Sequence, residues 1–160
     1  MSISKRINGI GRGALQTTIM EREMSQNGIG RILWQRGGLG RYAWIELTWL
    51  PNVQTEIDIP EDVLAIDREW GGAAEVGIRL ALEIAGQTGH VMVTHLRGMV
   101  VDTTAMVVCL AAMTATWDAL RWPVPPALGD TIQSWIAMRS PDWNAMVQQF
   151  RNWVNWMNPG

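Results

Sequence analysis

The segment of residues 41–50 constrains the fold of this chain more than any other, because its apolar side chains alternate strictly with polar or mixed ones. Successive side chains of an extended strand point to opposite faces of a sheet. One face of this strand is wholly apolar and consists of Ala43, Ile45, Leu47 and Trp49. The pattern therefore predicts a half-buried strand, with this apolar face turned toward the core and the Tyr42 and Trp44 face turned away.

Signals for helices and strands follow one another between residues 60 and 122. A proline and two acids at 60–62 start a helix, and Gly71-Gly72 interrupts it. A second helix runs over 73–85, and a strand covers 90–96. After a short strand at 99–101, an apolar helix extends over 103–120. After the strand at 41–50, these segments give the order helix, strand, short strand, helix.

A stiff joint with three prolines follows, at Pro123, Pro125 and Pro126. Helical spacing then resumes and continues to Met157. We therefore expect a domain at residues 1–122 and a Trp-rich helical extension at residues 123–160.

Charge is distributed unevenly along the 160 residues. The whole chain has 13 Lys+Arg and 15 Asp+Glu, a net charge of −2. Residues 1–41 alone carry seven basic and two acidic side chains, or +5. This balance argues against a general nucleic-acid coat and allows local contact with phosphate, although chance asymmetry explains it equally well.

The residue types offer little chemistry. Cys109 is the single cysteine, it stands among apolar neighbours, and it is expected to be a core thiol. His90 and His95 are five residues apart on a strand, which predicts opposite faces and argues against a shared metal ion. We expect no catalytic set, no metal site and no cofactor, and the chain is expected not to be an enzyme. An enzyme on this fold stays open only if a pocket joins His95 to an acid.

The sequence predicts neither secretion nor membrane insertion. No charged segment followed by an apolar run starts the chain, and the most apolar run, 105–115, is too short for a bilayer. A single cysteine suits a reducing compartment. The expectation is a cytoplasmic protein without membrane contact.

The glycines of residues 27–40 predict a long, flexible hairpin connection that follows a strand at 16–24. Glycine lets a backbone approach phosphates closely, arginine supplies charge, and aromatic rings stack on bases. The predicted RNA-contacting residues are Arg31, Trp34, Gln35, Arg36, Gly37, Gly38, Gly40, Arg41 and Tyr42. The alternative is an ordinary hairpin loop.

Tryptophan and methionine recur at helical spacing near the C-terminus. Such a stripe forms either core packing or an adaptable interface. As an interface, it would bind a protein partner or a second copy of the chain through Trp143, Val147, Phe150 and Trp153.

Residues 35–42, Gln-Arg-Gly-Gly-Leu-Gly-Arg-Tyr, resemble a signature of the fourth domain of elongation factor G, Gln-Ser-Gly-Gly-x-Gly-Gln-Tyr. The tetracycline-resistance ribosomal protection proteins share that domain. Further motifs of the domain follow in the same order, at residues 20–24, 75–79, 90–94 and 102–106. The resemblance implies an α+β fold, a four-stranded mixed sheet with two helices on one face and a left-handed β-α-β crossover, as in domain 2 of ribosomal protein S5. It also implies contact with the ribosome or its RNA.

This chain departs from the family in three respects. It has no GTPase part, residues 99–101 contain no histidine where the family has a His-bearing loop, and residues 123–160 match none of the family's motifs. In the family, the histidine loop reaches the decoding centre of the ribosome. The resemblance therefore predicts RNA or ribosome binding, and it does not extend to translocation.

Overall fold

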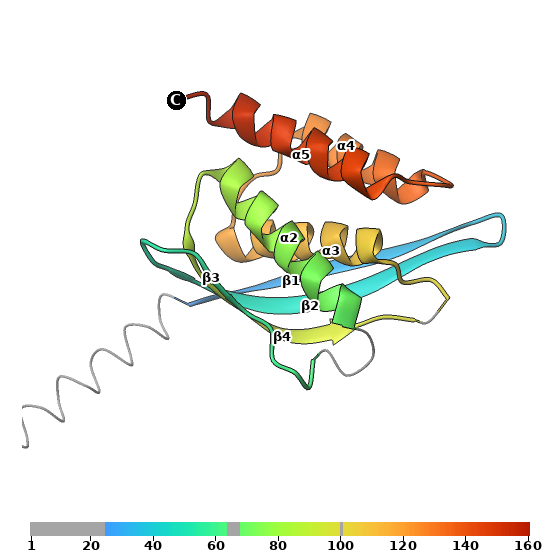
Figure 1. Cartoon of the computed structure of the whole chain (residues 1–160), viewed down its shortest axis with the longest axis horizontal. Helices are drawn as coiled ribbons and strands as arrows, with labels where there is room; N and C mark the ends of the chain where they lie inside the picture. The colour runs from blue at the N-terminus through green and yellow to red at the C-terminus, as the bar shows by residue number, and fades with distance from the viewer. Residues whose placement is uncertain (1–24, 64–67, 100) are drawn as a thin grey trace, which may run out of the picture.

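The computed structural model describes residues 25–63, 68–99 and 101–160, and the element labels are those of Figure 1. The elements are β1 (Gln26–Arg36), β2 (Leu39–Pro51), β3 (Glu56–Asp58), α2 (Arg68–Ala85), β4 (Gly89–Arg97), α3 (Ala105–Leu120), α4 (Pro126–Ala137) and α5 (Trp143–Met157). The strand expected at 16–24 and the family motif at 20–24 lie outside the described residues.

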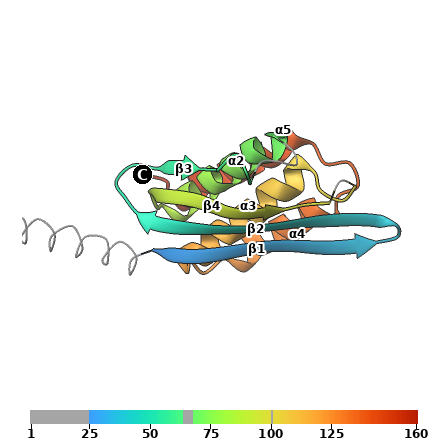
Figure 2. The same cartoon turned by 90° about the horizontal axis from the view of Figure 1, so that it is seen from below.

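The strands form one mixed sheet in the order β1-β2-β4-β3. β3 and β4 are parallel and are joined through α2, which makes a β-α-β unit, and the other pairs are antiparallel. α2 and α3 lie on one face of the sheet, and no described element covers the other face (Figure 2). The predicted α+β fold class is confirmed.

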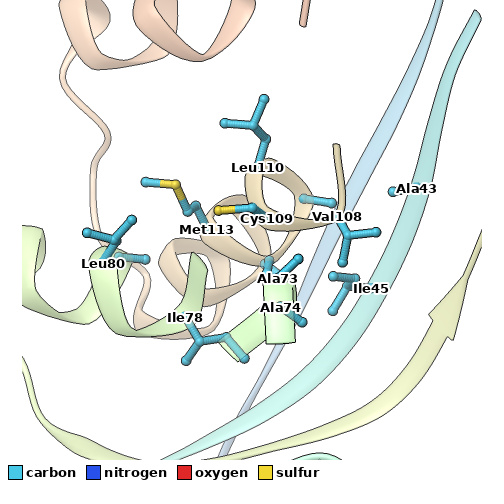
Figure 3. Close-up of a cluster of buried hydrophobic side chains, with 14 of the residues drawn as sticks. Ala43, Ile45, Ala73, Ala74, Ile78, Leu80, Val108, Cys109, Leu110 and Met113 are labelled. Carbon is cyan, nitrogen blue, oxygen red and sulfur yellow. The ribbon is translucent and has the colours of Figure 1, made fainter. Parts of the chain in front are cut away.

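The C-terminal helices α4 and α5 form a third layer beyond α2 and α3 (Figure 1). α3 is buried on nearly all sides, because the sheet lies against one side of it and this layer lies beyond the other. A helix that is apolar all round requires such enclosure. One buried cluster runs through the three layers, and Leu128, Met146 and Phe150 of the third layer belong to it. Figure 3 shows its centre, where Cys109 and Met113 of α3 lie between Leu80 of α2 and Ile45 of β2.

β1 corrects the prediction of a flexible connection at 27–40. Alternate residues Gly28, Gly30 and Ile32 are buried on the helix side of this strand. A Cβ atom at Gly30 would lie 1.9 Å from the backbone oxygen of Ala111, and one at Gly28 would lie 2.0 Å from that of Ala115. The glycines thus allow α3 to pack directly on the strand backbone, where the sequence suggested loop flexibility.

The connection between β1 and β2 is only two residues long. Arg36 pairs with Leu39, and the intervening Gly37 and Gly38 have φ of 55° and 80°. Two positive φ angles in a two-residue loop match the twist of the flanking strands. The two strands are therefore paired right up to the two-residue turn.

A β-bulge reverses the expected facing of the end of β4. Glu46 pairs with His95 and Leu47 pairs with Val93, which leaves Thr94 as the extra residue. Leu96 consequently points into the core, and His95 lies on the uncovered face. The prediction that His90 and His95 occupy opposite faces is wrong, because strict alternation fails at a bulge.

Two smaller predictions also fail. Gly71 and Gly72 lie within α2 and do not interrupt it. Met99 and Val101 belong to no strand, and Val100 lies outside the described residues. Instead, the chain here follows the edge of β2, where the Tyr42 N–H donates to the carbonyl of Asp102 at 3.0 Å.

Candidate nucleic-acid interface

Two arginines flank a tryptophan on the uncovered face of the sheet. Trp44 on β2 pairs with Arg31 on β1 and with Arg97 on β4, so the three residues form one row across three strands. The guanidinium carbon of Arg31 lies 5.3 Å from the centroid of the Trp44 ring. Both arginines are exposed, whereas the indole is half-buried. The row thus presents two cations and an aromatic side chain to solvent.

The hairpin continues this surface beyond the end of β4. Pairing of β4 with β2 ends at Trp44, and the two longer strands project past it (Figure 2). Gln35, Arg36, Gly37 and Gly38 are exposed at the tip. On the uncovered face, Leu33 is 68% exposed and pairs with Tyr42. The tip therefore offers a positive charge and open backbone, as expected from the sequence.

The structure divides the predicted RNA-contacting residues into two groups. Arg31, Gln35 and Tyr42 alternate onto the uncovered face of the hairpin, and Arg36, Gly37 and Gly38 form the tip. The other group is Trp34 and Arg41, which lie on the helix side, and Gly40, which lies beneath another side chain. Successive residues of a strand alternate between the two faces of the sheet, and this alternation separates the two groups.

Trp34 and Arg41 face the helices. Trp34 packs against the core cluster, and Arg41 is only 8% exposed. The Arg41 guanidinium donates to the carbonyls of Gly40 and Met138, each at 3.2 Å. The expectation that Arg41 contacts RNA is therefore wrong, whereas half-buried Trp34 lies on the opposite face of the hairpin from Arg31 and Tyr42.

Gly40 faces the side of the sheet away from the helices, and the side chain of Asp102 covers it there. A Cβ atom there would lie 2.7 Å from the carboxyl carbon of Asp102. Asp102 thus sits over the strand backbone, and Gly40 is not an open backbone contact.

Sequence reasoning predicted neither Arg97 as a contact residue nor the stacking of Arg31 on Trp44. Trp44 was placed correctly on the outward face, but the arginines that flank it come from two other strands. Arg97 is 53 positions from Trp44 along the chain. No local pattern reports a pairing at that separation, since register depends on the bulge and on the sheet order.

Acidic groups are present on the same face. Glu46 lies in the next outward position of β2 after Trp44, and at the far edge Asp58 accepts from His90 Nε2 at 2.6 Å. The basic side chains Arg31, Arg36 and Arg97 lie toward the hairpin tip. On the uncovered face, Arg31 and Arg97 therefore lie nearer the hairpin tip than Glu46 does, and one carboxylate, that of Asp102, lies beyond them over Gly40.

The predicted C-terminal partner surface is mostly internal. Phe150 is completely buried, and Trp143, Val147 and Trp153 are half-buried and pack against the core cluster. The prediction of Phe150 as a partner contact is therefore wrong. Trp156, which was not predicted as a contact, is 70% exposed and meets Trp153 edge-on at 5.3 Å between ring centroids.

Buried surroundings also decide the role of Cys109. Its side chain lies within the apolar cluster, and desolvation raises the pKa of the thiol to about 12. Because the thiolate is the reactive form, this cysteine is an inert core residue, as predicted.

The described residues provide neither a metal-binding cluster nor a membrane-spanning helix. No group of three or more His, Cys, Asp or Glu side chains in the described ranges is placed to hold a metal ion. Likewise, no helix in this part of the chain is long and apolar enough to cross a bilayer.

Comparison with known proteins shows the fold alone. No family model and no curated protein matches the chain. Among solved structures, a crystal structure of a protein from Thermus thermophilus is similar, with a TM-score of 0.50 and 24% identity. The match covers 57% of this chain and 15% of that protein, so this chain corresponds to a small part of the larger one.

Proposed function

We propose that this chain is a relative of the fourth domain of elongation factor G and that it binds structured RNA, on the ribosome or elsewhere, without catalysis. The contact surface is the hairpin tip together with the outward row Arg31–Trp44–Arg97. The observation that carries the proposal is this row of two arginines around a tryptophan, two of whose members lie on the hairpin that ends in the exposed tip.

The chemistry of the row suits RNA. A guanidinium stacked on an indole presents a flat, cationic surface, on which an unpaired base stacks while the charge meets its phosphate. The exposed glycines at the tip let a phosphate chain approach the hairpin backbone. Neighbouring Leu33 and Tyr42 add apolar and aromatic area to the same surface.

The fold and motif order support the relationship to the elongation factor domain. The glycine signature lies at the β1–β2 turn, and the strand and helix motifs at residues 90–94 and 102–106 fall on β4 and at the start of α3. The segment at 99–101 contains no histidine. We therefore assign binding to this chain, and no translocation step.

A matched pair of double variants tests the RNA surface. Arg31→Gln with Arg97→Gln removes two cations from the row, and Arg79→Gln with Arg151→Gln removes two exposed cations from α2 and α5. Both variants change the net charge equally. Fluorescence anisotropy with a labelled RNA stem-loop, repeated over a range of salt concentrations, measures affinity and the number of phosphate contacts.

The row variant should bind at least tenfold more weakly, and the slope of log K against log salt should fall by about 1.4–1.8, as each of the two lost phosphate contacts removes about 0.7–0.9. The control variant should keep the affinity and slope of the parent. Equal behaviour of the two variants would reject the surface. Co-sedimentation with ribosomes then tells whether ribosomal RNA is the target.

A second candidate function rests on Trp156. This exposed ring and Trp153 border a depression of about 590 Å³, which Ala127, Gln149 and Asn152 complete. Exposed tryptophan is enriched at protein interfaces. If a protein partner or a second copy binds here, Trp156→Ala should lower the mass in sedimentation velocity without lowering the melting temperature. An unchanged mass would remove this candidate.

A further inference from the structure

A second cavity lies on the helix side of the hairpin, at the start of α3. Its volume is about 420 Å³. Its walls come from the hairpin base, the first turn of α3 and the α4–α5 connection: Leu39, Arg41, Thr104, Ala105, Met106, Arg139, Pro141 and Trp143. Such a volume lies within the range that small-molecule sites occupy.

Arg41 in this cavity is a buried cation with no anionic partner among the described residues. Its side chain is 8% exposed, and within the described ranges it forms no ion pair. Two of its donors reach backbone carbonyls, but the buried Nε–H finds no hydrogen-bond partner in the described part of the chain. Burying a charge is unfavourable unless it is paired, and the described part of the chain supplies no counter-ion to this guanidinium.

The other polar groups at the cavity are also suited to an anion. Arg139, an exposed side chain, lines the same wall. The 16-residue helix α3 begins there, and the first N–H groups of a helix lack intrahelical partners and carry partial positive charge. The Thr104 hydroxyl accepts from Val107 N–H at 3.3 Å, and the two preceding residues of the first turn, Ala105 and Met106, line the cavity.

Among the residues that the structure describes, no carboxylate lines this cavity. Asp142, next to Trp143, is occupied as the N-cap of α5, where its side chain accepts from the N–H groups of Asn144 and Ala145. Asp102 lies over Gly40, on the opposite face of β2 from Arg41 by strand alternation. The charge that faces the cavity is therefore positive.

We propose that this cavity is a phosphate-binding site, in which Arg41, Arg139 and the first amides of α3 hold the phosphoryl group. The apolar walls from Met106, Pro141 and Trp143 accept the flat or apolar body that carries it. The site is separate from the RNA surface on the uncovered face, and it does not depend on the proposed function. Its phosphate belongs either to a free phosphorylated small molecule or to a terminal phosphate of RNA.

An NMR titration of the ¹⁵N-labelled full chain tests the site. Sodium phosphate is added at constant ionic strength, and the amide signals of Ala105 and Met106 and the Nε–H signal of Arg41 are followed. We expect saturable shifts of these signals. Arg139→Gln should weaken the affinity about tenfold or more, because a charged hydrogen bond is lost, and this exposed position leaves the fold intact.

Arg151→Gln on α5 is the matched control and should titrate like the parent chain. Shifts that do not saturate, or equal affinity of the parent and Arg139→Gln, would overturn the site. Two further arms distinguish the source of the phosphate. A nucleoside monophosphate that shifts the same signals more strongly than inorganic phosphate identifies a free small molecule, and a 5′-phosphorylated oligoribonucleotide that does so identifies an RNA end.

The phosphate site can also be separated from the RNA surface. Arg31→Gln with Arg97→Gln should leave the phosphate titration unchanged, because neither residue lines the cavity. Failure of RNA binding in that variant, with normal phosphate binding, would show that the two sites are independent. A loss of phosphate binding in the same variant would contradict the assignment to Arg41 and Arg139.

Discussion

The β1–β2 hairpin and the α4–α5 pair both carry aromatic side chains that suggested a binding surface. These side chains are partly exposed on the hairpin and mostly buried or half-buried in the helix pair. The hairpin projects beyond the sheet and keeps one face open (Figure 2). The helix pair lies over α2 and α3, and its periodic stripe is turned inward. The difference follows from what each region covers, because a stripe that encloses an apolar helix is core, whatever residues compose it.

α3 explains why the C-terminal helices are part of the fold. Its interior positions are apolar on all sides, so a single sheet cannot satisfy it. Further ties support the third layer: the Trp135 indole donates to Gln149 at 2.6 Å between α4 and α5, and Asn158 donates to the Glu83 carbonyl of α2 at 2.8 Å. The third layer therefore supports the sheet that presents the hairpin.

The largest expected effect tests this structural role. Phe150→Ala removes a fully buried ring, and the free energy of unfolding should fall by about 3–5 kcal/mol. Trp156→Ala, at the exposed end of the same helix, should change it by less than about 0.5 kcal/mol. Urea unfolding measures both. If both variants lose the same free energy of unfolding, the claim that the stripe of α5 is internal while its end is exposed is contradicted.

Gly30 tests the corresponding contact of the hairpin. Gly30→Ala places a methyl group against the Ala111 carbonyl, so α3 must move, and the loss of stability should be about 3 kcal/mol. Gly129→Ala in α4 meets no atom within 4 Å and should stabilise the chain by about 0.5–1 kcal/mol, since alanine favours helix. If Gly30→Ala is tolerated, β1 does not pack as closely on α3 as described.

The smallest effect concerns the hairpin tip. Gly38 has φ of 80° with open space around it, so Gly38→Ala should lose about 1–2 kcal/mol through backbone conformation alone. Gly38→Asn should be tolerated better, because asparagine accepts the left-handed region. Thermal unfolding compares the two. Equal losses would show that conformation at the tip is not the cause.

Local patterns predicted the core face of β2 and the core role of Cys109, because periodicity and composition are visible in a single chain. The fold class was predicted from the resemblance to the elongation factor domain, and it is confirmed. β1 was missed because Gly28 and Gly30 replace the apolar side chains of a normal strand, and their reason for being small lies in α3. The facing of His95 was missed because a bulge depends on the pairing of two distant strands.

The residues of the candidate sites could be predicted only in part from the sequence, for the same reason. The tip residues Arg36, Gly37 and Gly38 could be named from the glycine signature. Arg97 joins Trp44 only through strand pairing, and Arg139 joins Arg41 only through the third layer. Sequence reasoning assigned Arg41 to the RNA surface for its charge, although alternation within the predicted strand at 41–50 places it on the same face as Ala43.

Photocrosslinking of a 4-thiouridine RNA, followed by peptide mapping, tests the central claim most directly. The account predicts crosslinked peptides from residues 26–44 and 89–97, which contain the tip and the row of Arg31, Trp44 and Arg97. Crosslinks confined to residues 126–157, or none at concentrations that saturate anisotropy, would contradict an RNA surface on the uncovered face of the sheet.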